Sequence, residues 1–353
     1  ALALLINSRT WCQFCPMGSL QKVSHKLGEY SGITKYTEKK VTIENTSKCH
    51  TCGKCSRVCP FQLTPYLEFD EHNQFNNINC IRCSTCVENC PANILSLQVE
   101  GNAKRIKENS ATDGYENRRR ILARIKNIKD FKDDLKEFEF QFINPRNVQY
   151  KAGQFILIKI QDNPLQYRAY SISSNNRDDG TLKVIIKKVE NGYGTNLIFK
   201  HNIGDEVVLE GPMGNELVVP EGAKKLLFIS NGIGVTPFIG LVEESLDRDE
   251  IESIIFLNGQ RFESDFIYND QFKMMDLDND KFKYMPISSR ESNDNFLKGY
   301  VTDYLDDLDL SEYKVFMCGS KAMIEQSYHK LLFNGVNSKD IYFESEERIN
   351  LSA

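Results

Sequence analysis

The pattern of hydrophobic and polar residues changes along this chain of 353 residues. Between residues 118 and 221, short apolar runs rich in β-branched and aromatic residues are separated by Gly, Asn, Asp and Pro. Dense short runs of this kind predict an antiparallel β-barrel. From residue 222 onward, apolar strands alternate with amphipathic helical segments. That alternation predicts a parallel sheet with helices on both faces.

The first part of the chain is dominated by cysteine. Of eleven cysteines, ten lie within the first 90 residues, and residues 101–117 form a polar stretch that predicts a linker. No stretch with the sustained apolar core of a secretory signal peptide is seen, so structural disulfides are not expected. The formal net charge of −5 and the absence of a long basic run argue against nucleic acid as a partner.

Two segments share the spacing C-x2-C-x2-C-x3-C-P, namely residues 49–60 and residues 80–91. In such a segment, three cysteines of one loop hold three corners of an iron–sulfur cube, and the fourth ligates the other cluster. One [4Fe–4S] cluster is thus assigned Cys49, Cys52, Cys55 and Cys90. The other is assigned Cys80, Cys83, Cys86 and Cys59.

Paired zinc knuckles and disulfides are the alternatives for these cysteines, but zinc sites present C-x2-C pairs separated by longer spacers. Residues 45–100 resemble a bacterial-type two-[4Fe–4S] ferredoxin domain. That resemblance implies clusters that carry single electrons.

Six short motifs in the second part of the chain occur in the order found in the ferredoxin–NADP reductase superfamily. They are RAYSISS, KKVENGYGTNL, GPMG, NGIGVTPF, CGSKAM and IYFE. Residues 118–345 therefore resemble that superfamily. The whole chain is predicted to be an α+β multidomain protein with a ferredoxin-like domain at 45–100, a linker at 101–117, an FAD-binding antiparallel β-barrel at 118–221 and an NAD(P)-binding α/β domain at 222–353.

The resemblance assigns the flavin site to two motifs. Arg168 is expected to pair with a flavin phosphate, Tyr170 to offer its ring to the isoalloxazine, and Ser171 to lie near the hydride-accepting nitrogen. In the second motif, Gly192 and Gly194 are expected to free backbone amides for the pyrophosphate. Thr195 is expected to act there as helix N-cap and phosphate ligand.

The second nucleotide site is assigned to the remaining motifs. Gly232 and Gly234 are expected to admit the NAD(P) pyrophosphate, Thr236 to add a hydroxyl and Pro237 to start a helix. The superfamily also implies that Cys318 and Glu344 lie beside the nicotinamide.

The choice between NAD and NADP stays open at this point. Arg290, with Ser289 and Lys298, could bind a 2′-phosphate as the similar segment does in NADP-linked relatives. A Ser-Arg pair at a strand end is equally common in solvated loops.

This order of domains implies an NAD(P)H oxidoreductase. Hydride carries two electrons and each cluster accepts one, so the flavin serves as the converter between them. The electrons would pass to or from a protein carrier or the subunits of a redox complex. The alternative is a non-catalytic relay subunit of a larger complex, of the sulfite reductase or hydrogenase diaphorase kind. An oxygenase reductase is less favoured, because those typically carry the plant-type spacing C-x4-C-x2-C.

The stretch TWCQFCPMGSL leaves Cys12 and Cys15 without a cluster. It is similar to the segment that follows a transmembrane helix in membrane polyferredoxins, although the spacing of the two cysteines differs. Trp11 suits a membrane interface, and Arg9, Lys22 and Lys26 suit a positive cytoplasmic flank. We therefore expect residues 1–44 to dock the protein at the cytoplasmic membrane face, with a membrane subunit or a longer native chain. The alternative is an amphipathic N-terminus with two incidental thiols.

Overall fold

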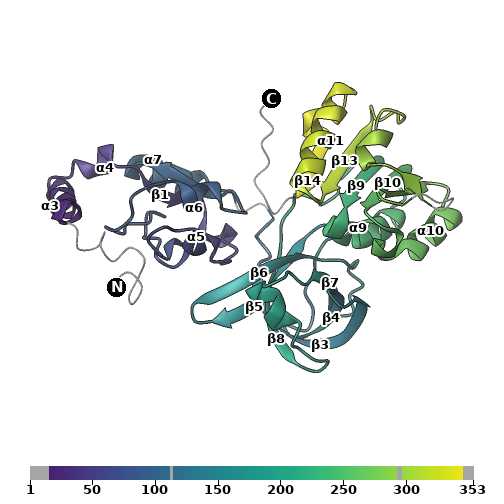
Figure 1. The fold of residues 1–353 in the computed structure, drawn as a ribbon, viewed down its shortest axis with the longest axis horizontal. Helices are drawn as coiled ribbons and strands as arrows, with labels where there is room; N and C mark the ends of the chain where they lie inside the picture. The colour runs from purple at the N-terminus through teal and green to yellow at the C-terminus, as the bar shows by residue number, and fades with distance from the viewer. Residues whose placement is uncertain (1–15, 112–113, 292–295, 345–353) are drawn as a thin grey trace. The chain divides into compact units, whose positions relative to one another are not determined.

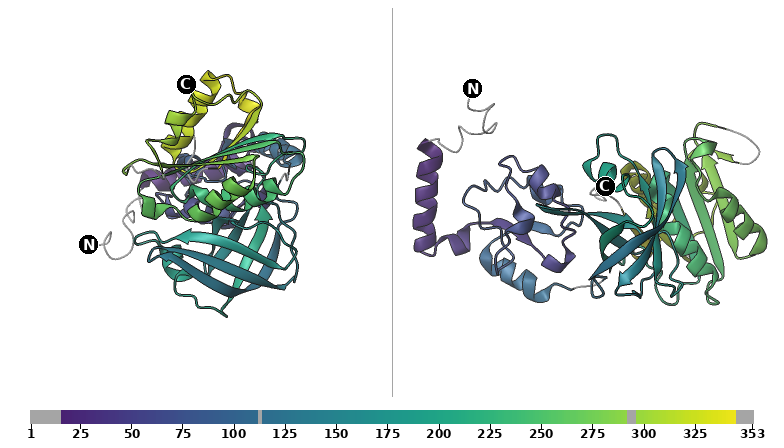
Figure 2. Two further views of the ribbon diagram at one scale, coloured as in Figure 1. Left: turned by 90° about the vertical axis from the view of Figure 1, so that its right-hand side faces the viewer. Right: turned by 90° about the horizontal axis from the view of Figure 1, so that it is seen from below.

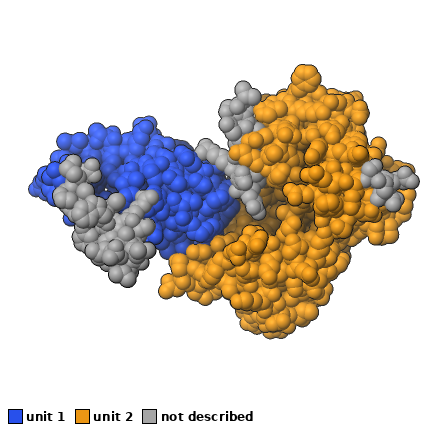
Figure 3. All heavy atoms as spheres, viewed as in Figure 1, with its two compact units in different colours: residues 1–112 blue, residues 113–353 orange. Residues whose placement is uncertain are grey.

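The computed structural model describes residues 16–111, 114–291 and 296–344. The chain divides into two compact units, residues 1–112 and 113–353, which Figure 3 colours separately. Arg9, Trp11, Cys12 and Cys15, on which the expected docking role rests in part, lie outside the described residues. Within the described ranges, every helix is too short or too polar to cross a lipid bilayer.

The first unit contains a small antiparallel sheet surrounded by short helices (Figure 1). Strand β1 (Lys40–Ile43) pairs with β2 (Leu95–Gln98). The helical elements are α3 (Pro16–Tyr30), α4 (Thr34–Thr37), η1 (Thr46–Lys48), α5 (Lys54–Arg57), η2 (Pro65–Leu67), α6 (Thr85–Glu88) and α7 (Glu100–Asn109). Val41 and Phe75 are almost fully buried and pack with Cys55 and Cys86, so the cysteine loops are part of the core of this unit.

The predicted linker at residues 101–117 is wrong in its first half, because residues 100–109 form α7. Ala103 in this helix is fully buried, and the Lys104 ammonium donates a 2.8 Å hydrogen bond to Glu100 one turn earlier. The buried methyl group of Ala103 and side-chain hydrogen bonds between residues four positions apart stabilise this helix, although its composition is almost entirely polar. The boundary predicted at residue 45 also differs, since β1 lies before it and belongs to the same sheet as β2.

The second unit begins with a six-stranded antiparallel sheet in the order β6-β5-β8-β3-β4-β7. Its strands are β3 (Arg119–Lys132), β4 (Leu135–Asn144), β5 (Phe155–Asp162), β6 (Leu165–Ser171), β7 (Thr181–Lys187) and β8 (Glu206–Met213), with helix α8 (Tyr193–Ile198) between β7 and β8. An antiparallel bridge between Ile172 and Val184 joins the end of β6 to β7, so the two outer strands meet. The sheet thereby closes into the predicted barrel.

Side chains alternate between the two faces of this barrel. On β5, Ile156 and Ile158 belong to the interior cluster, whereas Phe155 and Leu157 belong to a cluster on the opposite face of the sheet. This period of two is the property from which the sequence predicts strands here.

A six-stranded parallel sheet follows, in the order β12-β11-β10-β9-β13-β14 (Figures 1 and 2). Its strands are β9 (Lys225–Asn231), β10 (Ser253–Gln260), β11 (Phe282–Ser288), β12 (Leu297–Lys298), β13 (Tyr313–Cys318) and β14 (Ile341–Glu344). The helices are η3 (Gly232–Val235), α9 (Thr236–Leu246), η4 (Glu263–Asp265), α10 (Asn269–Asp278), η5 (Val301–Tyr304), α11 (Lys321–Phe333) and η6 (Ser338–Asp340). On β9, Leu226 and Phe228 pack with α9, while Leu227 and Ile229 pack with α11, so helices cover both faces as predicted.

The barrel and the parallel sheet share a hydrophobic core. Leu135 and Leu217 of the barrel half belong to the same buried cluster as Phe238 of α9. Gly240 in α9 lies so close to the barrel that a Cβ atom there would stand 2.7 Å from the carbonyl carbon of Ser174. The two halves of this unit are therefore packed against each other without room for a side chain at that point.

Candidate cofactor sites

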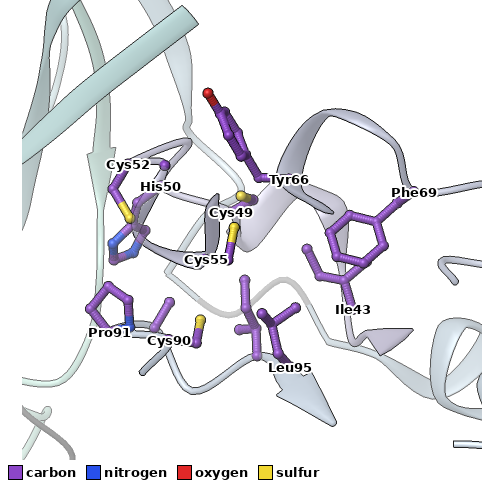
Figure 4. Close-up of a pocket in the computed structure, with 13 residues that line it drawn as sticks. Ile43, Cys49, His50, Cys52, Cys55, Tyr66, Phe69, Cys90, Pro91 and Leu95 are labelled. Carbon is purple, nitrogen blue, oxygen red and sulfur yellow. The ribbon is translucent and has the colours of Figure 1, made fainter. Parts of the chain in front are cut away.

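The first cysteine site is a cavity in the first unit. Cys49, Cys52, Cys55 and Cys90 line it together with apolar residues that include Ile43, Phe69 and Leu95. In Figure 4 the four sulfur atoms face a common space. Three of these cysteines come from one loop and the fourth from the other motif, 35 residues beyond Cys55.

The second cysteine site has the reciprocal composition. Cys80, Cys83 and Cys86 from the second loop line a separate cavity with Cys59 from the first motif. The rest of that lining is apolar and includes Val41, Leu63 and Phe75. The structure thus brings the cysteines together in the same two sets that the motif spacing predicts.

The two loops owe their curvature to paired left-handed residues. Thr51 and Gly53 in the first loop have φ values of 50° and 68°, and Arg82 and Ser84 occupy the same motif positions in the second with 54° and 63°. Left-handed residues reverse the chain within a few positions, which turns successive cysteines toward one centre. The backbone N–H of Thr51 also donates to the sulfur of Cys49 at 3.4 Å.

Burial raises the pKa of four of these thiols. Desolvation raises the pKa of Cys55 to about 12 and that of Cys86 to about 11. It also raises the pKa of Cys80 and of Cys90. Such thiols stay protonated in a protein without metal, whereas binding to iron displaces the proton and gives thiolate ligands.

The donor set of each cavity fits an iron–sulfur cube. None of the nine described cysteines forms a disulfide. Over residues 16–111, 114–291 and 296–344, three or more His, Cys, Asp or Glu side chains nowhere converge closely enough to hold a metal ion. Four cysteines around each cavity agree with the four thiolate ligands of a cluster.

The predicted flavin residues lie on β6 and α8. Arg168 and Tyr170 are opposite Ile158 and Ile156 of β5, whose side chains point into the barrel. Ser171 is opposite Phe155 and hence belongs to the other face at the end of the strand. Arg168 and Tyr170 therefore share a face that Ser171 does not.

The two glycines of the second flavin motif are held by close contacts. A Cβ atom on Gly194 would stand 3.1 Å from Cγ of Arg168 and 3.2 Å from its Nε. One on Gly192 would stand 2.8 Å from the hydroxyl oxygen of Thr195. Gly194 thus leaves room for the guanidinium of Arg168, whose Nη1 donates to the Tyr167 carbonyl at 2.7 Å.

Thr195 does not have the predicted role of N-cap. Gly192 is the N-cap of α8, and Thr195 is the third residue of that short helix. Its hydroxyl accepts from the N–H of Val189 at 3.1 Å and donates to the carbonyl of Gly192 at 3.3 Å. The side chain closes the preceding turn, because the backbone folds back before α8 begins.

The predicted NAD(P) residues gather where the order of the parallel sheet reverses. From β9 the chain builds outward through β10 and β11, then returns to add β13 and β14 on the other side of β9. Ligands of open α/β sheets bind at such a switch point, outside the carboxyl ends of the strands. Gly232 follows β9 at this edge, and Cys318 ends β13 in register with Ser230 of β9. Glu344 ends β14 in register with Cys318, so these two residues lie side by side on adjacent strands.

The glycines of this site have different surroundings. Gly232 has a φ of +58° and no atom within 4 Å of its Cβ position, so its outer side is open. A Cβ atom on Gly234 would stand 2.1 Å from the carbonyl oxygen of Cys318. The absence of a side chain at Gly234 thus serves packing against β13, which differs from the predicted role of admitting a pyrophosphate.

Thr236 and Pro237 begin helix α9, with Pro237 in its first turn as expected. Thr236 is only 5% exposed, and its hydroxyl donates to the carbonyl of Ile233. It is therefore engaged in the turn of η3 and does not present a donor to the outside in this conformation.

Sequence reasoning did not single out a hydrogen-bonded pair at this edge of the sheet, Asn231 and Ser320. Asn231 accepts from the N–H of Ser320 at 2.8 Å and donates to the Ser320 hydroxyl at 2.9 Å. Both residues belong to quoted motifs, yet their pairing depends on the neighbouring positions of β9 and β13. This contact joins the two loops that flank the switch point.

Arg290 lies at the carboxyl end of β11 and is exposed. Its backbone N–H donates to the carbonyl of Arg261 at 3.0 Å, so a second exposed arginine stands beside it at the end of β10. Lys298 is in register with Ser288 on the other side. Arg261 has no motif around it, and only the adjacency of β10 and β11 reveals it.

Three family models match this chain in succession. The 4Fe-4S dicluster domain matches residues 40–91, the oxidoreductase FAD-binding domain residues 122–216 and the oxidoreductase NAD-binding domain residues 228–329. The chain thus contains an iron–sulfur dicluster domain followed by an FAD module and an NAD module of the oxidoreductase kind. Both predicted resemblances and the class of oxidoreductase are thereby confirmed.

Several curated proteins are similar to this chain. Phenol hydroxylase P5 protein of Acinetobacter pittii (strain PHEA-2) is 24% identical over 230 residues, which cover 63% of this chain and 64% of that protein. The propane 2-monooxygenase reductase component of Rhodococcus jostii (strain RHA1) is 21% identical over 314 residues, 84% of this chain and 82% of that protein. The chain thus spans less than two thirds of phenol hydroxylase P5 protein.

Among solved structures, the ferredoxin NADP+ reductase of Neisseria gonorrhoeae with bound FAD and NADP has a TM-score of 0.56 at 22% identity. The likeness covers 65% of this chain and 98% of that chain. It confirms the predicted fold of an antiparallel sheet domain followed by a parallel sheet domain.

Proposed function

We propose that this chain transfers electrons between NAD(P)H and a protein partner through FAD and two [4Fe–4S] clusters. The observation that carries the proposal is the pair of four-cysteine cavities on a chain whose other unit contains an FAD module and an NAD module. When bound, FAD accepts hydride and releases electrons singly, and the clusters carry single electrons. Either direction of flow agrees with these features.

In this proposal the ligands of the clusters are the two crossed sets of cysteines. Cys49, Cys52, Cys55 and Cys90 hold one cluster, and Cys59, Cys80, Cys83 and Cys86 hold the other. The reciprocal lining of the two cavities supports the assignment. Cys83 is exposed, so the second cluster would have an edge near solvent from which an electron can reach a partner.

In the flavin site, Arg168 neutralises a phosphate and Tyr170 covers the ring system. The close fit of Gly194 against Arg168 supports this, because a side chain there would displace the guanidinium. Ser171, at the end of the same strand, would hydrogen-bond near the atom that accepts hydride. Gly192 serves as the N-cap of α8, where it has no side chain to bond the first backbone amides of the helix.

In the nicotinamide site, the open side of Gly232 admits the NAD(P) pyrophosphate at the switch point. Cys318 and Glu344 would flank the nicotinamide and orient it for hydride transfer. Their register on adjacent strands at the same sheet edge supports a joint role. Gly234 and Thr236 act by shaping the turn.

The cofactor preference we propose is for NADP(H). Arg290, Lys298 and the neighbouring Arg261 present three positive charges around the carboxyl ends of β10, β11 and β12. A 2′-phosphate offers the complementary charge and accepts bidentate hydrogen bonds from arginine.

The purified chain tests the proposal directly. We expect NAD(P)H-driven reduction of an artificial electron acceptor by the isolated protein with FAD and clusters in place. If the loaded protein does not oxidise NAD(P)H but exchanges single electrons with a chemical reductant, the relay subunit is the correct description.

A further inference from the structure

Helix α3 in the first unit presents its apolar side chains to solvent. Leu20 is 64% exposed, Val23 57%, Leu27 65% and Tyr30 95%. Their spacing of three, four and three residues places them on one side of the helix. These four residues are called the α3 face below.

The opposite side of α3 makes polar contacts with its own unit. Nε2 of His25 lies 2.8 Å from Oε2 of Glu38, and Glu38 also pairs with Arg82 of the second cysteine loop. Glu29 lies 3.9 Å from the ammonium of Lys40. An amphipathic helix of a globular protein normally buries its apolar side. In α3 the polar side contacts the unit and the apolar side faces solvent, and the helix lies at the edge of the unit (Figure 2).

Two more exposed apolar side chains follow the helix. Ile33 is 60% exposed and Tyr36, on the adjoining α4, is 83% exposed. A patch of exposed apolar side chains such as the α3 face, with polar residues beside it, marks a contact with a protein or a membrane. The charges around it decide between these occupants.

Those charges are predominantly positive. Lys22, Lys26, Lys35 and Lys39 lie in the same segment, and none has a salt bridge to another described residue. Both acidic residues of residues 16–39, Glu29 and Glu38, are already paired. The segment is thus basic within a chain whose net charge is −5.

We propose that the α3 face lies on an anionic lipid surface, with its leucine and valine side chains among the acyl chains and its lysines at the phosphates. A helix with one apolar side, tyrosines near the boundary and flanking lysines suits the plane of a membrane interface. Each lysine near an anionic surface adds to the attraction. The inference extends beyond electron transfer and does not depend on it.

Vesicle sedimentation of the full chain tests this directly. We expect the protein to sediment with vesicles of phosphatidylcholine and phosphatidylglycerol and to be released by high salt. Val23→Ser with Leu27→Ser should weaken binding by at least roughly tenfold, because two apolar contacts are lost. Lys22→Gln with Lys26→Gln should weaken it roughly fivefold for each lysine, on the anionic vesicles only.

The matched control is Leu277→Ser with Phe333→Ser in the second unit. These side chains are 86% and 90% exposed, so the control removes apolar surface elsewhere and should leave binding unchanged. The substituted side chains are exposed, except that Lys22 is half-buried, and retained iron content checks that the variants of α3 fold. Failure of the unaltered chain to bind anionic vesicles would overturn the proposal. So would a dimer in solution that Leu27→Ser dissolves while the vesicles stay bare, since a second copy would then cover the α3 face.

Discussion

Replacement of Cys90 by alanine tests which motif each fourth cysteine serves. Cys90 lines the cavity of Cys49, Cys52 and Cys55, although 35 residues separate it from the nearest of these. Two cubes would give about eight iron atoms per chain. Loss of one ligand from one cavity should therefore lower the iron content to about four, with the second cavity unaffected.

Iron content alone does not tell which cluster is lost, so the assay is alkylation of thiols under anaerobic conditions followed by peptide mass analysis. In Cys90→Ala we expect Cys49 and Cys52 to react, while Cys83 stays protected although it is exposed. Cys55 is a poor reporter, because burial raises its pKa to about 12 and the thiolate is the reactive form.

The reciprocal variant provides the internal control. In Cys59→Ala, Cys80 and Cys83 should react and Cys49 should stay protected, because Cys59 lines their cavity. Cys318 lies outside both cavities. The Cys318→Ala variant should therefore retain about eight iron atoms. Reaction of Cys83 in Cys90→Ala, with Cys49 still protected, would refute the crossed arrangement.

Three further predictions concern the nucleotide sites. Arg168→Ala combined with Tyr170→Ala should release FAD while iron stays bound, as measured by flavin absorbance and iron content; retained flavin would contradict the roles given to them. Gly232→Val should abolish NAD(P)H oxidation but keep the flavin, because a side chain would occupy the open side at φ +58°; joint loss of flavin would show that the two sites are not separate. Arg290→Ala should weaken NADPH binding by roughly 1.5–3 kcal/mol, the value of a charge-assisted hydrogen bond, with little effect on NADH. Arg119→Ala, at another exposed arginine, is the control. Equal weakening of NADPH and NADH binding in Arg290→Ala would show that Arg290 does not recognise the 2′-phosphate.

The sequence alone predicted the features that depend on neighbours along the chain. The spacing of cysteines within each loop, the alternation of apolar residues in the barrel strands and the order of the nucleotide motifs are local patterns. Each follows from the geometry of a few consecutive residues. The crossed sets of cysteines could also be predicted, because a fourth cysteine four residues after the third does not reach the same cube.

Local patterns did not predict the features that depend on distant neighbours. Gly234 matches a phosphate-binding motif, yet its lack of a side chain accommodates the carbonyl of Cys318, which only the adjacency of β9 and β13 brings near. Arg261 joins Arg290 because β10 and β11 are neighbours in the sheet. Polar residues 100–109 form a helix because Ala103 finds a buried place in the first unit.

Helix α3 illustrates the same division. Its amphipathic pattern is readable in the sequence, but periodicity does not say which side faces the protein. The contacts of His25 and Glu29 with Glu38 and Lys40 turn the polar side inward. Periodicity is a property of consecutive residues, whereas orientation depends on partners brought together by folding, and so the tertiary structure alone decided that the apolar side points outward.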